Sequence, residues 1–169
     1  MLIIFAERKI NIMARPQNNR IVNNPPLFSE FKPVGVAGRE LNKIYISLDE
    51  YEAIRLADKL GLSHLDASQE MNVSRSTFSR LVESARRKIA EFIITGKMLT
   101  IEGGNVHFIN NIIKCFDCGY MFNIKMDEHF SECPECKSNN LINIAGNYGH
   151  GRCCVEHNEH KRYRKRGNN

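Results

Sequence analysis

The sequence predicts a mainly α protein, in which a three-helix domain is followed by a small β module and a flexible tail. Two observations lead to this prediction. Residues 62–88 contain two segments with apolar residues at helical spacing, each preceded by a serine. Residues 115–136 contain two closely spaced cysteine pairs, and short runs with strand composition follow each pair. A chain of 169 residues is long enough for one or two such domains.

The first of these stretches has the start and stop signals of two closely linked helices. Ser63, with Asp66 three residues later, forms a capping-box variant at the start of one helix. Asn72 stands where that helix must end, and asparagine tolerates the left-handed conformation of a C-cap. Ser74 can cap a second helix that begins at Arg75. This is the helix-turn-helix pattern, which places its second helix in the major groove of DNA.

The two faces of the second helix differ in chemistry. Apolar residues recur at helical spacing on the inner face: Phe78, Leu81, Val82, Ala85 and Ile89. We expect them to meet the apolar residues of the first helix and turn: Leu65, Ala67, Met71 and Val73. The candidate DNA-binding residues are the cap and the polar or basic residues outside this stripe: Ser74, Arg75, Ser76, Thr77, Ser79, Arg80, Arg86, Arg87 and Lys88. A helical hairpin with a solvated basic face is the alternative.

The segments before these helices complete the first half. Residues 1–12 form an N-terminal extension, and Met13 is a second plausible start. Residues 13–47 form a basic arm and a loop rich in proline and glycine. Arg15 and Arg20 suit the arm to the minor groove, and a disordered terminus explains the arm equally well. Phe28 and Phe31 are expected to hold the loop against the core. A capping box at residues 47–50 then starts the first of three helices in a DNA-binding domain that spans residues 48–98.

Charge is distributed unevenly along the chain, whose net charge is +5. Residues 48–98 hold eight Lys/Arg against eight Asp/Glu, but the acids begin the first helix and the basic residues gather on the last. Residues 1–47 and 147–169 each carry +4. Basic ends of this kind suit contact with phosphates, and solubility explains them equally well.

The second half is dominated by cysteine. Cys115 and Cys118 form one C-x2-C pair, and Cys133 and Cys136 form another, with fourteen residues between the pairs. Four thiolates at this spacing predict one structural, tetrahedral Zn²⁺ site in a zinc ribbon, which together with a β-hairpin makes up residues 99–146. Its expected strands are residues 120–124 and 141–144, with a preceding hairpin at residues 99–108 that turns at Gly-Gly. Iron, as in rubredoxin, also suits four thiolates, whereas disulfides suit an oxidising compartment.

Residues 147–169 are expected to form a flexible basic tail that contains histidine and cysteine. A second metal site or a redox site is the alternative for five residues: His150, Cys153, Cys154, His157 and His160. The basic run at residues 161–166 suits contact with a nucleic-acid backbone but not base reading.

Several segments resemble an uncharacterised prokaryotic family whose members are described as predicted DNA-binding proteins. They are MARP at residues 13–16, FKPVG at 31–35, LDEYEAIRLAD at 48–58, GLS at 61–63, VSRSTFSR at 73–80, SARRK at 84–88 and IEGG at 101–104. The resemblance covers residues 13–104 and implies a helix-turn-helix similar to region four of bacterial sigma factors. Ser76 departs from it where proline is frequent, and His64 departs where a polar or acidic helix-former is usual.

Together these features predict a cytoplasmic, sequence-specific DNA-binding protein, a transcriptional regulator that is not an enzyme. No phosphate-binding glycine loop, nucleophile elbow or H-E-x-x-H motif is present, and no apolar run is long enough to cross a membrane. Double-stranded DNA is the expected partner, and a homodimer is left open. A rubredoxin-like electron-transfer or redox-sensing protein and an RNA-binding zinc protein are the competing hypotheses.

Overall fold

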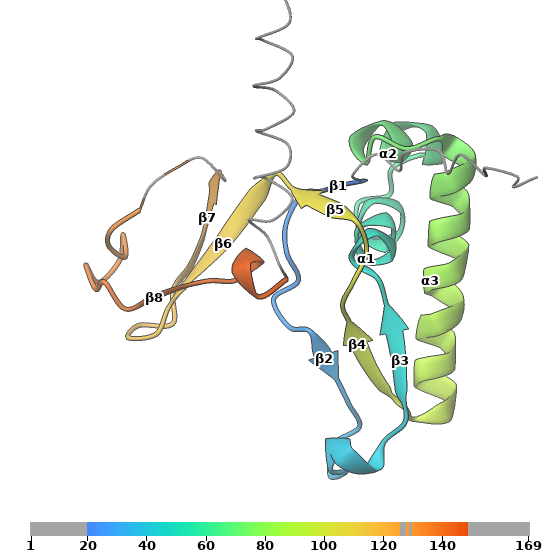
Figure 1. Ribbon diagram of the computed structural model, residues 1–169, viewed down its shortest axis with the longest axis horizontal. Coiled ribbons are helices and arrows are strands. Elements are labelled where there is room, and N and C mark those ends of the chain that lie inside the picture. Colours follow the sequence, from blue (N-terminus) through green and yellow to red (C-terminus); the bar gives the residue numbers. More distant parts are fainter. Residues whose placement is uncertain (1–19, 126–127, 129, 149–169) are drawn as a thin grey trace, which may run out of the picture.

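The computed structural model describes residues 20–125, 128 and 130–148, and these residues form a mixed α/β structure (Figure 1). The predicted mainly α class is therefore wrong, because three small sheets accompany the helices. Two of the strands that sequence patterns missed, Arg20–Val22 and Glu30–Phe31, are only three and two residues long. Strands this short are below the length at which alternation of apolar and polar residues can be recognised.

One sheet supports the three helices. Its central strand is β4 (Met98–Ile101), which pairs parallel with β3 (Lys43–Ile46) and antiparallel with β2 (Glu30–Phe31). A single 3-10 turn, η1 (Gly38–Glu40), separates β2 from β3. The α-helices that the structure describes all lie in the crossover between β3 and β4: α1 (Leu48–Ile54), its π-helical continuation η2 (Arg55–Lys59), α2 (His64–Glu70) and α3 (Arg75–Thr95).

The expected hairpin at residues 99–108 does not form. Instead, β5 (Val106–Phe108) pairs parallel with β1 (Arg20–Val22), while β4 belongs to the other sheet. The reason lies at the two glycines, which cross the N-terminus of α1: the backbone N–H of Leu48 donates to the carbonyl of Gly103 at 3.1 Å. Both glycines have positive φ, 75° at Gly103 and 96° at Gly104, a conformation that glycine adopts without steric cost.

The predicted helix signals are confirmed. Ser63 Oγ accepts the backbone N–H of Asp66 at 3.2 Å, and Ser74 Oγ accepts that of Thr77 at 3.1 Å. Asn72 has a φ of 52° in the turn between α2 and α3, and Gly96 ends α3 at a φ of 63°. Local capping thus sets the helix ends as the sequence indicated.

The helices pack around one apolar cluster, formed by Ala53, Leu56, Ala67, Met71, Phe78 and Val82. Leu65 was expected in this interface but is 55% exposed. The expected anchoring of the loop by Phe28 and Phe31 is also wrong, because these side chains are 66% and 43% exposed. The loop is held instead by Pro25 and Pro26, which are fully buried.

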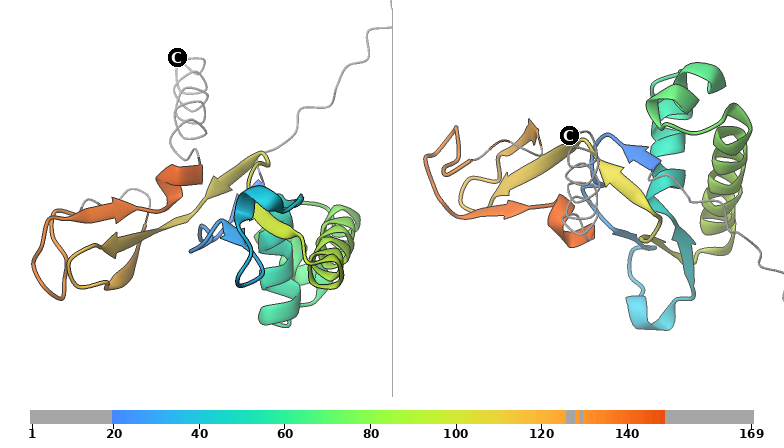
Figure 2. Two further views of the ribbon diagram at one scale, coloured as in Figure 1. Left: turned by 90° about the horizontal axis from the view of Figure 1, so that it is seen from below. Right: turned by 45° about the horizontal axis from the view of Figure 1, so that its top comes forward.

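The cysteine-bearing sheet projects away from the helices (Figure 2). Its central strand β6 (Asn110–Cys115) pairs antiparallel with β7 (Met121–Lys125) and β8 (Leu141–Asn143). These strands agree with the expected positions of two ribbon strands. The 3-10 turn η3 (Ala145–Tyr148) then returns to the core, where Ala145 is buried in one cluster with Val22, Leu48 and Phe108. No helix among the described residues is long and apolar enough to span a membrane.

Candidate nucleic-acid interface and metal centre

The N-terminal turn of α3 is an exposed polar surface. Ser74, Arg75 and Ser76 are exposed, and Thr77 is half-buried. The Ser74 hydroxyl lies 3.0 Å from that of Ser76 and 2.8 Å from that of Thr77, so one small hydroxyl cluster caps the helix. No acidic side chain lies in this first turn. The uncompensated N–H groups therefore leave positive potential at the helix start.

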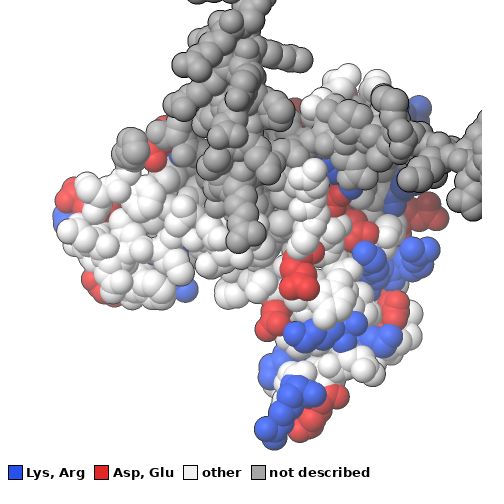
Figure 3. Space-filling model, in the orientation of Figure 1, with Lys and Arg blue, Asp and Glu red and all other residues white. Residues whose placement is uncertain are grey.

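The outward face of α3 carries arginines without acidic partners. Ser76, Arg80 and Arg87 are exposed and, at 3.6 residues per turn, project on the same side of the helix. Within the described part of the chain, Arg75, Arg80 and Arg87 make no ion pair. Glu83 shares this face. The helical side of the molecule carries most of the visible charge, whereas the visible face of the cysteine-bearing sheet is largely uncharged (Figure 3).

Two other predicted DNA-binding residues are engaged within the fold. Arg86 forms a bidentate pair with Asp58, at 2.5 Å and 3.2 Å, and this hydrogen-bonded pair holds the pKa of the Asp58 carboxyl below its usual value. Lys88 Nζ lies 2.7 Å and 2.8 Å from the two carboxylate oxygens of Glu50, which is 5% exposed. Both cations therefore join α3 to the segment that runs from α1 into η2.

Ser79 joins α3 to α2. Its hydroxyl donates to the carbonyl of Arg75 at 3.0 Å and lies 2.9 Å from His64 Nδ1. The His64 ring meets Phe78 edge-on, with centroids 5.3 Å apart. These contacts fix the orientation of α3 relative to α2, so His64 has a structural place in the turn.

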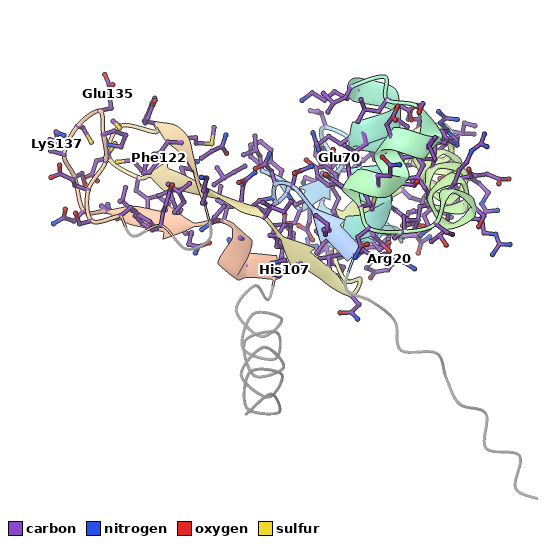
Figure 4. The ribbon with its side chains drawn as sticks, turned by 90° about the horizontal axis from the view of Figure 1, so that it is seen from above. Arg20, Glu70, His107, Phe122, Glu135 and Lys137 are labelled. Carbon is purple, nitrogen blue, oxygen red and sulfur yellow. The ribbon has the colours of Figure 1, made fainter. Side chains whose placement is uncertain are left out.

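Sequence reasoning missed a set of buried acids on α1. Asp49 pairs with Arg20, and Glu52, which is fully buried, pairs with Arg55 at 2.7 Å. Glu52 also accepts the backbone and side-chain N–H groups of Asn23 at 3.1 and 3.0 Å. Only the Glu52–Arg55 pair has a local sequence signal, namely its i,i+3 spacing. Arg20 was expected in a free basic arm, but it is held in β1 against α1 (Figure 4).

The four cysteines of the two C-x2-C pairs come together. Their sulfur atoms all lie within 4.8 Å of one another, at the end of the sheet that carries Glu135 and Lys137 (Figure 4). Each pair is followed by a residue with positive φ, 75° at Gly119 and 62° at Lys137. The backbone N–H of Gly119 donates to the Cys115 carbonyl, and that of Lys137 donates to the Cys133 carbonyl. The two turns thus present their thiols symmetrically, and together they form a four-sulfur donor set that can hold a metal ion.

The surroundings of the sulfurs shift the pKa values of Cys115 and Cys136 in opposite directions. Backbone N–H groups of Cys118 and Asp117 lower the pKa of the Cys115 thiol to about 7. The backbone N–H of Ser138 favours the Cys136 thiolate, but hydrogen bonding with the other sulfurs outweighs it and raises the pKa of Cys136 to about 12. Four adjacent thiols therefore resist losing all their protons unless a cation compensates the charge.

Asp117, in the first cysteine-bearing turn, forms hydrogen bonds with two residues that follow the second. Its carboxylate accepts the hydroxyl of Ser138, and it accepts the side-chain amide of Asn140 at 2.8 Å. These contacts hold the pKa of the Asp117 carboxyl below its usual value. The proposed second metal or redox residues (His150, Cys153, Cys154, His157 and His160) lie outside the described residues.

Comparison with known proteins shows the family of the chain. Residues 8–109 match the family model described as "Protein of unknown function DUF134". The chain belongs to this family. The resemblance over residues 13–104 indicated an uncharacterised prokaryotic family, and this membership is confirmed.

Close relatives cover most of the DUF134 chain. It is 46% identical over 129 residues to a UPF0251 protein of Chloroherpeton thalassium, which covers 76% of this chain and 85% of the relative. It is 39% identical over 145 residues to a UPF0251 protein of Caldicellulosiruptor bescii, covering 86% and 98%. With UPF0251 protein CT1277 of Chlorobaculum tepidum the identity is 38%, covering 83% and 74%. No solved structure matches the chain.

The DUF134 match includes all of the helices and the ion pairs of α1, whereas the four cysteines lie beyond residue 109. The match therefore covers the helical part of the chain and does not include the four-cysteine cluster.

Proposed function

We propose that the protein is a sequence-specific DNA-binding protein, a transcriptional regulator that acts in the cytoplasm and inserts the start of α3 into the major groove. The observation that carries this proposal is that Arg80 and Arg87 on the outward face of α3, and Arg75 at its exposed N-terminus, form no ion pair within the described part of the chain. Exposed arginines on one helix face reach guanine edges and phosphates together.

The contacts divide among the residues of α3. Arg75 and Ser76 stand at the exposed N-terminus, and Arg80 lies one turn beyond Ser76 on the same side of the helix as Ser76, so we assign base reading to these three residues. Ser74 and Thr77 hold the helix start, where backbone N–H groups suit a phosphate. Arg87 lies two turns beyond Arg80 and would contact the backbone.

Arg86, Lys88 and Ser79 take a different part in this proposal. They hold α3 against α1, η2 and α2, so that the outward arginines keep a fixed direction. Their loss would weaken DNA binding through the orientation of the helix and would lower stability at the same time. Arg80, in contrast, would affect binding alone.

The four-cysteine centre is assigned to one structural Zn²⁺ ion. All four donors are thiolates of the chain, so the site is closed, and closed four-sulfur sites favour zinc in a structural role. Iron would give the same donor set electron-transfer chemistry. Metal analysis separates the two readings: a colourless protein with about one zinc per chain supports the assignment, and a red protein with a reversible one-electron couple contradicts it.

Binding to a random duplex library tests the DNA-binding proposal. The expected result is enrichment of a defined sequence, and a palindromic site would report a homodimer. Arg80→Ala should weaken binding to that sequence by about 1–3 kcal/mol and relax the preference at one base position. Arg39→Ala is the matched control, because its side chain is 87% exposed and lies outside α3.

Loss of preference in Arg39→Ala, or unchanged affinity and preference in both Arg75→Ala and Arg80→Ala, would contradict the proposal. Structured RNA in competition with the selected duplex provides the comparison with an RNA-binding role. Stronger binding to RNA would replace the DNA assignment.

A further inference from the structure

A groove of about 410 Å³ lies where the segment leading into β2 faces the cysteine-bearing sheet. In Figures 1 and 2, η3 lies beside this segment, so the groove is formed by parts of the chain more than eighty residues apart. Phe28 lines it on one side, and Phe116, Ile142 and Tyr148 line it on the other. Its volume falls in the range of small-molecule sites, roughly 300–1,000 Å³.

The walls of the groove are mostly apolar and exposed. Phe28 is 66% exposed and Phe116 is 59% exposed, although both are large aromatic side chains. The ring of Tyr148 is fixed, because its hydroxyl donates to the carbonyl of Pro26 at 3.2 Å. Three aromatic side chains that line one groove suit a planar apolar ligand, since each ring offers a face or an edge for stacking.

One cation in the groove, the ammonium of Lys114, has no hydrogen-bond or ion-pair partner among the residues that the structure describes. Lys114 and Ile142 are cross-strand neighbours on β6 and β8, so their side chains share the face of the sheet that lines the groove. Lys114 is half-buried, yet its side-chain ammonium forms no hydrogen bond or ion pair with any residue that the structure describes. Glu30 also lines the groove, but its carboxylate faces Lys43 Nζ at 3.5 Å. The uncompensated charge of the groove is therefore positive.

We propose that this groove binds a small carboxylate with a planar apolar ring, the carboxylate pairing with Lys114 and the ring lying between Phe28 and Phe116. An ion pair in a partly buried site gives orientation, and the apolar walls give most of the affinity. The ligand would join the loop before β2 to the cysteine-bearing sheet, which gives the protein a small-molecule effector site. The inference concerns the free protein and is independent of the proposed DNA binding.

Naphthalene-2-carboxylate and its neutral isostere naphthalene-2-carboxamide are suitable probes, titrated by calorimetry into the full chain without DNA. The carboxylate should bind at one saturable site. Lys114→Met keeps the length of the side chain and removes the charge, so the affinity for the carboxylate should fall about tenfold while that for the carboxamide stays the same. Phe28→Ala should weaken both probes alike, and its exposed position makes it harmless to folding.

Lys125→Met is the matched control, since Lys125 is an exposed lysine on β7 that does not line the groove. It should bind both probes as the wild type does. The proposal is overturned if neither probe saturates, if Lys114→Met weakens both probes equally, or if Lys125→Met loses as much affinity as Lys114→Met. Metal content and thermal unfolding of each variant verify that the fold is intact.

Discussion

The basic side chains on α3 fall into two groups: some form ion pairs within the fold, and others have no acidic neighbour. Lys88 meets a buried carboxylate, and Arg86 meets Asp58 at the surface, whereas Arg80 and Arg87 meet no acid in the described structure. In the sequence all four are basic residues within one helix. The difference arises because α1 and η2 place acids against one edge of α3 and not against its outer face.

Replacement of Lys88 by methionine should destabilise the protein by about 2–3 kcal/mol, because Glu50 would remain buried without its cation. Urea unfolding measures the change. Arg86→Met is the control: its pair with Asp58 is solvent-exposed, so the expected loss is below about 1 kcal/mol. Equal losses in the two variants would show that burial does not separate the pairs.

The pH dependence of stability should report on Glu50. Burial alone disfavours its carboxylate, but hydrogen bonds from Lys88, Ser84 and the Ser47 backbone outweigh burial and lower its pKa from the ordinary 4.5. A carboxyl whose pKa is lower in the folded state stabilises the protein above its unfolded pKa, and this contribution disappears as the pH falls through the folded value. The stabilisation should therefore be complete above pH 4.5 and be lost at more acidic pH.

Glu50→Gln isolates this contribution, since the amide oxygen can still accept the backbone N–H of Ser47. The difference in unfolding free energy between the wild type and Glu50→Gln should be largest near neutral pH and shrink below pH 4.5. A difference that stays constant from neutral to acidic pH would contradict the assignment of the Glu50–Lys88 pair.

At the scale of elements, the Gly-Gly segment and the start of α1 fix each other. Gly103 accepts a hydrogen bond from the α1 N-terminus, and a Cβ added to Gly104 would lie 3.3 Å from the Asp49 carboxylate oxygen. This crossing decides that β4 and β5 enter different sheets.

Gly104→Ala should destabilise the protein by about 2–3 kcal/mol, because backbone strain at a φ of 96° adds to the close approach to Asp49. Gly103→Ala is the internal control: its φ of 75° is strained, but a Cβ there meets nothing within 4 Å, so about 1–2 kcal/mol is expected. Thermal unfolding compares the two. A greater loss in Gly103→Ala would show that contact with α1 does not matter.

At the scale of the whole molecule, the four-cysteine cluster lies at the far end of a sheet that projects from the helical core. In the described part of the chain, β6 and η3 connect this sheet to the rest: the backbone N–H of Asn110 donates to the carbonyl of Asn23, and Ala145 is buried with Val22, Leu48 and Phe108. The sheet has few buried side chains of its own, so a bound ion would supply much of its folding free energy.

Removal of the metal by a chelator should therefore increase amide hydrogen exchange in β6, β7 and β8 and leave exchange in α3 nearly unchanged. Cys133→Ser should behave in the same way without chelator, since Cys133 is fully buried among the four sulfurs. Mass spectrometry of exchanged fragments reads both regions in one sample. Equal loss of protection in α3 would show that the centre supports the entire fold.

The sequence by itself determined the features that arise from local chemistry. Serine caps at Ser63 and Ser74, the positive φ of Asn72 and the cysteine pairs each depend on residues within a few positions of one another. For this reason the helix ends and the four-sulfur set were predicted with the right residues. The spacing of the apolar residues within α3 also predicts which side of the helix faces outward.

Tertiary structure alone decided the pairings between distant residues. The parallel pairing of β1 with β5, the contact of Arg20 with Asp49, and the contact of Lys88 with Glu50 join positions that no sequence pattern relates. An ion pair between distant residues cannot be recognised from the sequence around either partner. Strands of two or three residues are too short to show a periodicity. The mainly α expectation failed for this reason, and the same long-range pairings decide which arginines of α3 are left free to meet a partner.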